Sequence, residues 1–398
     1  MKKNGSKALL LFMTIFLLTG CWSSRELSDL AVVTALGIDK HEDGYKLTVQ
    51  VMDPGEIAGK DLTTRTSVTT YSMTGKTVFE ALRRLTVTTP RKLYLSHLRI
   101  ILLGQEFSEG GISQSLDFIS RDHEMRLEFS LMITKNMEAE KALKILTPIE
   151  KIPANKIYSS LQTAQDNWAP AKIVELDELV SSLTVPGKEA VLTGLSAVGS
   201  PEVGAQIENV EVVDSHTIVN IDEIGVFKDD KLVGWFNENE SKGFNYITDN
   251  VRNTIGWVEC GKEEEGTISV EVTKNETKLK GSIDSNLPKI TIETTIEANI
   301  ADVECAIDVY DQSKIKEIEG KLKKKIEEII KESIGKAKEL NSDVFGFGQV
   351  LSRQEPKQWK QLKDNWDKEF ADLDIEVKVK FNIRGTGTIT ETLLGNMK

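Results

Sequence analysis

The chain has 398 residues, of which 39% are hydrophobic and 28% are charged, and this composition is typical of a globular protein. Its formal net charge is −12, and so acidic a chain has no general attraction for nucleic acid or for anionic lipid. These values argue against a nucleic-acid-binding protein and against electrostatic attachment to a membrane.

The first 21 residues predict a lipoprotein signal peptide. Three lysines precede the apolar run Ala8–Leu18, whose 11 residues are too few for a membrane-spanning helix, which needs about 20. The run ends in Leu18-Thr19-Gly20-Cys21, which resembles a bacterial lipobox. We therefore expect cleavage after residue 20 and attachment of S-diacylglycerol and N-palmitoyl groups to Cys21. The alternative is an ordinary signal peptide that happens to contain a cysteine.

The expected lipid matters because the mature chain is even more acidic. Without the signal peptide, 47 basic residues remain against 62 acidic ones, a formal charge of −15. Two acyl chains on one cysteine give a stable anchor, whereas one chain binds only marginally. We expect the lipid on Cys21 to hold the protein on the outer side of a cytoplasmic membrane.

The length that remains suggests two or three domains. The clearest break in the pattern is the segment 199–204, which is rich in glycine, serine and proline. We predict the signal peptide at 1–20, an N-terminal α+β region at 21–200, a linker at 201–220 and a C-terminal α+β domain at 221–390. A further division of the first region near Ile149 is left open.

In the N-terminal region, buried or alternating apolar runs predict strands and apolar stripes at helical spacing predict helices. The expected strands are 30–38, 45–52, 67–73, 98–103, 127–134 and 189–198. The expected helices are 76–85, 112–119, 138–146 and 171–183. Strands that alternate with helices in this way indicate a compact α/β or α+β unit.

In the C-terminal domain we expect an antiparallel sheet covered by one long amphipathic helix. The expected strands are 221–227, 232–236, 255–260, 266–272, 277–283, 290–309 and 374–383. The expected helices are 237–247, 313–340, 342–351 and 356–370. Apolar residues recur at spacings of three and four along 313–340, which favours core packing over a free partner-binding helix.

Two cysteines remain beyond Cys21, namely Cys260 and Cys305. An extracytoplasmic location permits a disulfide between them, but a chain this long can also keep two separate buried thiols. Both alternatives stay open.

The sequence holds no recognisable catalytic or metal-binding pattern, and we expect no enzyme, no metal and no cofactor. His41, His97, His123 and His216 are scattered, and none has a second histidine or cysteine at metal-ligand spacing. No nucleophile elbow or Walker-type loop occurs. The run Phe345-Gly346-Phe347-Gly348 follows an expected helix and predicts a tight turn anchored by aromatic residues.

An ordered set of short motifs resembles the Ger(x)C family, the lipoprotein C subunits of nutrient germinant receptors in endospore-forming bacteria. In the first half these motifs are Cys21-Trp22, Arg25-Glu26-Leu27, Leu30 to Asp39, Leu95 to Gly104, Phe118 and Arg121-Asp122. In the second half they are Gly225 to Phe227, Leu232 to Trp235, Ser241-Lys242-Gly243, Asp343 to Gly348, Trp359, Trp366 and Ile383 to Gly387.

The resemblance implies attachment to the outer face of the spore inner membrane through the modified Cys21. It implies two integral-membrane partners, the A and B subunits, in a receptor that senses amino acids, sugars or nucleosides and triggers germination. The implied fold is three α+β domains, and no catalytic residues are implied. The alternative is a solute-binding lipoprotein that delivers a small molecule to a membrane transporter, for which two similar lobes around a polar cleft are expected.

Overall fold

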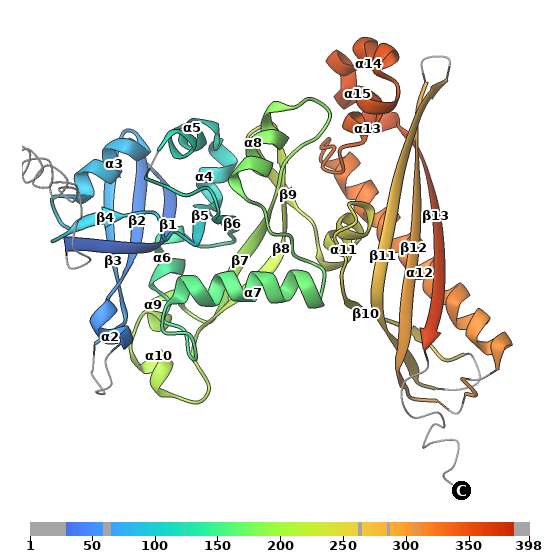
Figure 1. Cartoon of the computed structure of the whole chain (residues 1–398), viewed down its shortest axis with the longest axis horizontal. Helices are drawn as coiled ribbons and strands as arrows, with labels where there is room; N and C mark the ends of the chain where they lie inside the picture. The colour runs from blue at the N-terminus through green and yellow to red at the C-terminus, as the bar shows by residue number, and fades with distance from the viewer. Residues whose placement is uncertain are drawn as a thin grey trace, which may run out of the picture.

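The computed structural model describes residues 29–58, 65–122, 124–261, 265–284, 287–305, 307–309 and 311–385. The predicted signal peptide, Cys21 and His123 lie outside these residues. The chain forms two sheets that lie side by side, and the predicted α+β class is confirmed (Figure 1).

The first sheet has nine strands in the order β3-β2-β1-β5-β6-β7-β8-β9, with β4 paired to β1. Its strands are β1 (Leu30–His41), β2 (Gly44–Met52), β3 (Val68–Gly75), β4 (Lys92–Tyr94), β5 (Ile100–Gly104), β6 (Ser130–Thr134), β7 (Val191–Val198), β8 (Ile218–Lys228) and β9 (Lys231–Trp235). β1, β5, β6 and β7 are parallel and β4 pairs parallel to β1, whereas β2, β3, β8 and β9 pair antiparallel with their neighbours.

The central strands are buried on both faces, which is why they are continuous apolar runs. Every residue of β5 and β6 is buried. Alternate side chains of β5 enter different cores, because Ile101 and Leu103 pack on one face while Ile100 and Leu102 pack on the other. The first core contains residues of α3 (Val78–Leu85), α4 (Gln105–Gly110), α5 (Ser113–Arg121) and α8 (Leu176–Thr184). The second contains residues of α6 (Ala139–Lys144) and α7 (Pro153–Asn167).

The helices that accompany the first sheet lie between its strands in the sequence. They are α2 (Pro54–Ala58), α3 (Val78–Leu85), α4 (Gln105–Gly110), α5 (Ser113–Arg121), α6 (Ala139–Lys144), α7 (Pro153–Asn167), α8 (Leu176–Thr184), α9 (Pro201–Gly204) and α10 (Glu208–Glu211).

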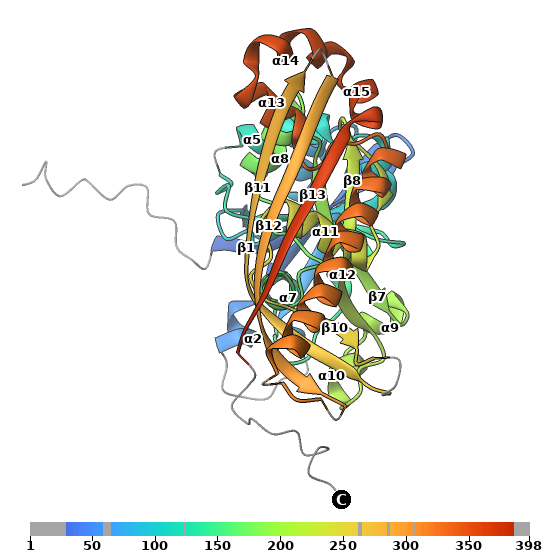
Figure 2. The ribbon, with the colours of Figure 1, turned by 90° about the vertical axis from the view of Figure 1, so that its right-hand side faces the viewer.

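The second sheet has the order β10-β11-β12-β13, and helices gather at one of its faces and at one end (Figure 2). Its elements are α11 (Glu238–Ile247), β10 (Thr254–Glu259), β11 (Thr267–Asp284), β12 (Leu287–Val303), α12 (Gln312–Glu339), α13 (Phe347–Gln354), α14 (Pro356–Leu362), α15 (Trp366–Asp372) and β13 (Asp374–Gly385). The expected long helix at 313–340 is confirmed as α12, whose apolar stripe lies in the same core as the inward side chains of β11 and β12.

Helix α11 crosses α12 very closely. A Cβ atom at Gly243 would lie 2.4 Å from the backbone oxygen of Ile329, so only glycine fits at this crossing. This contact explains why glycine stands in the Ser241-Lys242-Gly243 motif.

The second sheet differs from the expected antiparallel one at its last strand. β13 pairs parallel to β12, with Ile290 opposite Ile375 and Ile296 opposite Phe381. The reason is that α12 returns the chain along the sheet before β13 begins, as a parallel pair requires. The two strands expected at 266–272 and 277–283 are one strand, β11, with an irregularity between Val272 and Lys274.

The hairpin expected to open the C-terminal domain, at 221–236, extends the first sheet as β8 and β9. β8 pairs with β7 from Val191 to Val198, across the segment expected to be a linker. Residues 201–220 hold α9, α10 and the first residues of β8. The chain therefore leaves the first sheet shortly before residue 237, and all later strands belong to the second sheet. The division of the chain into domains at 200 and 221 stays a prediction.

Candidate functional site at the joint between the two sheets

The Asp343-Val-Phe-Gly-Phe-Gly348 motif forms a buried nest around one carboxylate. The backbone N–H groups of Gly346, Phe347 and Gly348 donate to the Asp343 carboxylate at 3.0, 3.0 and 2.8 Å. Trp366 Nε1 donates to the same carboxylate at 3.0 Å. Because its first N–H groups are satisfied in this way, α13 begins at Phe347 and not at the expected residue 342.

Burial raises the pKa of Asp343 to about 6, although the backbone N–H groups and Trp366 act in the opposite direction. The cause is that a carboxylate in an apolar enclosure loses its hydration. Asp343 is thus a buried acid whose two oxygens are surrounded by hydrogen-bond donors.

The same motif joins the two sheets. The N–H of Gln349 donates to Gly187 O at 3.0 Å, and the N–H of Glu189 donates to Asp343 O at 2.9 Å. Ser342 Oγ donates to Phe227 O, in β8, at 2.5 Å. We call this contact between residues 187–189 and 342–349 the joint.

Glycines make the joint possible. A Cβ atom at Gly348 would lie 2.6 Å from Gly187 Cα and within 2.8 Å of the Trp359 and Trp366 rings. Gly187 also has φ +88°, a conformation that side chains disfavour. The two backbones therefore touch directly, and the indole rings close over them.

An ion-pair cluster lies at the edge of the joint. Lys228 Nζ lies 2.8 Å from a carboxylate oxygen of Glu189 and 2.5 Å from one of Asp367. Burial acts to lower the pKa of Lys228, but its hydrogen bonds to Asp367 and Glu189 outweigh burial and raise that pKa. This cluster joins β8, the segment that leads into β7, and α15.

Asp39 performs a related task inside the first sheet. It lies at the end of β1, and its carboxylate accepts the N–H groups of Ala139 and Glu140, at 2.7 and 2.9 Å, at the start of α6. A Cβ atom at Gly104 would lie 2.3 Å from an Asp39 oxygen, so β5 also needs glycine here. Asp39 lines an open polar cavity of about 630 Å³ at the carboxyl ends of the central strands.

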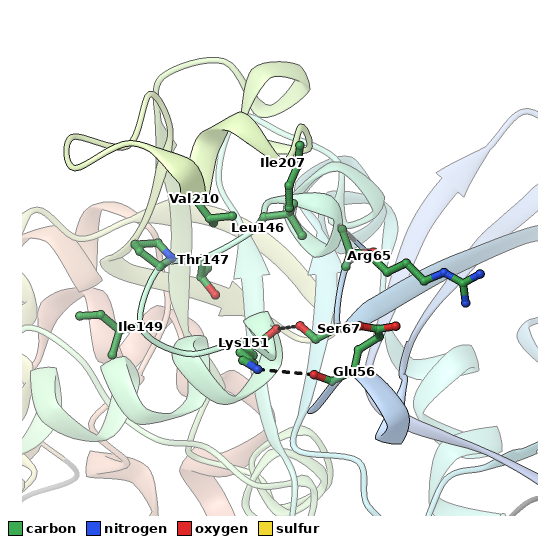
Figure 3. A pocket seen from close by; sticks show the side chains of 11 residues that line it. Glu56, Arg65, Ser67, Leu146, Thr147, Ile149, Lys151, Ile207 and Val210 are labelled. Atoms are coloured by element: carbon green, nitrogen blue, oxygen red, sulfur yellow. Dashed lines mark hydrogen bonds between the residues drawn. The ribbon is translucent and has the colours of Figure 1, made fainter. Parts of the chain in front are cut away.

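A second cavity, of about 340 Å³, lies at the opposite end of the first sheet and is shown in Figure 3. It lies among α2, the connection between α6 and α7, and α10. Ser67 Oγ donates to Lys151 O, and Lys151 Nζ donates to Glu56 O at 3.4 Å. The remaining lining consists of three polar residues, Arg65, Thr66 and Thr147, and five apolar ones, Leu146, Pro148, Ile149, Ile207 and Val210.

The structure resolves the open question about the two cysteines of the second sheet. Cys260 and Cys305 form a disulfide with a Cα–Cα distance of 6.4 Å. It connects the end of β10 to the residues that follow β12.

The histidines of the described ranges, His41, His97 and His216, are exposed, whereas Trp359 and Trp366 lie in the core. His97 is exposed, with its ring edge-on to Tyr94 at 5.6 Å. Trp359 and Trp366 pack edge to face in the core at 5.1 Å. Within the described ranges, no three histidine, cysteine or acidic side chains are grouped so that they could hold a metal. In the same ranges no helix combines the length and apolar character needed to cross a membrane.

The sequence identifies Asp39 and Asp343 only as members of family motifs and does not predict that they cap helices. For Asp343 a signal exists, because glycines three and five residues later are typical of a backbone turn closed by an acidic side chain. For Asp39 no local signal exists, since its partners are 100 residues away.

Two family models match the chain. One, described as a spore germination protein N-terminal domain, matches residues 23–197. The other, described as spore germination B3/GerAC like, C-terminal, matches residues 222–387 and includes the joint motif.

Known proteins match along nearly the whole chain. Spore germination protein KC of Bacillus subtilis is 31% identical over 388 residues, which cover 96% of this chain and 95% of the relative. Spore germination protein B3 of the same organism is 24% identical and covers 97% of this chain and 99% of the relative. The crystal structure of the GerBC protein shares the fold, with a TM-score of 0.52 at 20% identity, and the match covers 87% of this chain and 96% of that one. The chain belongs to the GerAC-like, or Ger(x)C, family of spore germination proteins.

Proposed function

We propose that this chain is a lipid-anchored accessory subunit of a spore nutrient germinant receptor. It acts through contacts with integral-membrane A and B subunits on the outer face of the spore inner membrane. The observation that carries the proposal is the match to spore germination protein KC over 96% of the chain. The lipobox-like Leu18-Thr19-Gly20-Cys21 at its start supports the anchor.

The buried polar groups support a role in assembly and not in catalysis. The carboxylates of Asp39 and Asp343 receive backbone N–H groups at the starts of helices. Lys228 is held between two carboxylates at the edge of the joint. Asp39 fixes α6 to the first sheet, whereas the Asp343 motif and Lys228 fix the two sheets to each other, which a subunit that works by protein contacts needs.

The alternative, a solute-binding lipoprotein, predicts two similar lobes around a polar cleft. The two parts of this chain differ, since one sheet has nine strands with helices on both faces and the other has four strands and one long helix. We therefore prefer the accessory subunit.

Deletion of the gene tests the proposal. Spores of the deletion strain are expected to lose or slow germination on one nutrient or nutrient mixture, with normal germination on the others. Normal germination on every nutrient, together with loss of uptake of one solute, would favour the transporter alternative.

The anchor is tested separately by Cys21→Ala, with Ser24→Ala as a matched control outside the lipobox. The Cys21→Ala protein is expected to leave the membrane fraction and to incorporate no labelled fatty acid, while the control stays membrane-bound and labelled. Equal labelling of both variants would remove the lipid from the proposal.

A further inference from the structure

Apolar side chains line one side of the cavity of Figure 3, whose other side is polar. We call this apolar side the basal patch and define it as the apolar cavity residues Pro148, Ile149, Ile207 and Val210 with Val213, which follows α10. Ile149 and Val213 are completely exposed, at 101% and 108%. Contiguous exposed apolar side chains of this kind are typical of interaction sites.

Ile149 is held outward by an unusual backbone. Its φ is +67°, a region that β-branched residues rarely adopt. The N–H of Glu150 donates to Pro148 O at 2.7 Å, which closes a γ-turn around Ile149, and Thr147 Oγ1 donates to Glu150 O at 2.8 Å. A strained backbone at an exposed apolar side chain points to a functional constraint on that position.

The patch lies at the end of the first sheet where the chain enters from Cys21. Near this end Val33 of β1 pairs with Val51, and Met52 pairs with Val68, which follows the cavity residue Ser67. Eight residues separate Cys21 from Leu30. Even fully extended, such a connection spans only about 30 Å. A lipid on Cys21 therefore keeps this end of the sheet close to the membrane.

Charge indicates what covers the patch. Glu150, Glu208, Glu211 and Asp214 are exposed beside its apolar residues, and none of the ion pairs among the described residues involves them. Two basic side chains, Arg65 and Lys151, line the same cavity, so exposed carboxylates outnumber basic groups around the patch. Four carboxylates would be repelled by an anionic bilayer surface. They would instead attract a protein segment with basic residues beside its apolar ones.

We propose that the basal patch is the docking surface for an integral-membrane partner subunit, which presents an apolar segment flanked by lysine or arginine. The proposal rests on the proposed function above, because the anchor and the membrane partners are part of that function. It adds the surface and the chemistry of the contact.

Site-specific photo-crosslinking in the full receptor tests this docking. A photoreactive phenylalanine analogue is placed at Ile149 or at Val213, with Leu287 as the matched control. Leu287 is also exposed, at 72%, but lies at the tip of the β11–β12 hairpin. All three full-length proteins are co-expressed with the A and B subunits in membranes, and adducts are identified by mass.

We expect adducts with one membrane subunit from positions 149 and 213, at least tenfold more abundant than from 287. Adducts with lipid alone, adducts with a second copy of this chain, or equal yields at all three positions would overturn the docking proposal. So would an absence of adducts at 149 and 213 while the unmodified chain still co-purifies with the membrane subunits. Failure of the unmodified chain to co-purify would instead overturn the proposed function, and the docking with it.

Charge reversal supplies a second readout that does not depend on the apolar positions. The double variant Glu208→Lys, Glu211→Lys is expected to lower the adduct yield from position 213 at least fivefold, because it repels a basic segment. An unchanged yield, or a rise in lipid adducts at the expense of protein adducts, would contradict the assigned partner.

Discussion

Asp39 lies at the end of β1 and Asp343 lies ahead of α13, and each carboxylate accepts the first backbone N–H groups of a helix. Asp39 of β1 attaches α6 to the first sheet, beside an open cavity that water can enter. Both carboxylates are almost completely buried, but that of Asp343 is enclosed by the backbone of residues 346–348 and the Trp366 indole. Its motif also bonds to residues 187–189, which lead into β7 of the first sheet. The same interaction, an aspartate that caps a helix, therefore fixes a helix to its own sheet in one place and holds the two sheets together in the other.

Asp343→Ala is expected to have the largest effect. It leaves three backbone N–H groups and the Trp366 indole N–H without an acceptor in a dry site. We expect a loss of about 4 kcal/mol in the free energy of unfolding, from the usual cost of stranded buried donors. Urea unfolding followed by tryptophan fluorescence measures it. A loss equal to that of Asp39→Ala would mean that the two carboxylates contribute equally to the free energy of unfolding.

The pH dependence of stability is expected to reveal Asp343 as well. Its pKa in the folded protein is raised to about 6 from an ordinary 3.8, so the folded state binds the proton more tightly than the unfolded state. The resulting stabilisation is complete below pH 3.8 and is lost as the pH rises through 6. The loss amounts to about 3 kcal/mol.

Urea unfolding of the wild type and of Asp343→Asn between pH 4 and pH 7 isolates this contribution, because asparagine does not titrate. The stability of the wild type relative to the variant is expected to fall over that range. Parallel pH profiles would show that Asp343 keeps an ordinary pKa.

Gly348→Ala tests how much the close backbone contact at the joint contributes to stability. The added methyl would meet Gly187 Cα at 2.6 Å, and neither backbone can move without opening the joint. We expect a loss of about 2 kcal/mol, typical of overpacking. Gly335→Ala is the matched control, because nothing lies within 4 Å of its Cβ position on α12. The control is expected to gain up to about 1 kcal/mol from helix propensity.

Asp39→Ala is expected to cost least, about 1 kcal/mol, as for an ordinary helix cap. Water from the neighbouring cavity can reach the freed N–H groups of Ala139 and Glu140. Hydrogen exchange should then show faster exchange in α6 with the joint unaffected. Faster exchange at Gly348 and Gln349 in this variant would mean that the two sites are coupled.

Much of the fold follows from local pattern. The stripe of isoleucines and leucines predicted α12 to within one residue at each end, and the alternation of 374–383 predicted β13. These elements were predictable because their burial repeats with the period of the backbone. The candidate site is harder to predict from the sequence. Periodicity can identify 221–236 as a hairpin, but it carries no information on which sheet the hairpin joins.

The contacts of the joint show why the rest of the site cannot be predicted from the sequence. Asp343 meets Trp366 across 23 residues, and Gly348 meets Gly187 across a much longer separation. Neither contact leaves a repeat or a spacing in the sequence. The motif Phe345-Gly346-Phe347-Gly348 was correctly expected to be a tight turn, with Gly346 at φ +77°, but its partner in the other sheet came only from the fold.

The disulfide between Cys260 and Cys305 has a mechanical consequence. The bond closes a covalent ring around the whole β11–β12 hairpin, across a sequence separation of 45. A chain pulled from its two ends could therefore not extend this hairpin, and about 150 Å of contour length would stay locked. Tension applied between the two ends of the chain therefore passes from β10 to the segment before α12 through the disulfide and not through the backbone of the β11–β12 hairpin.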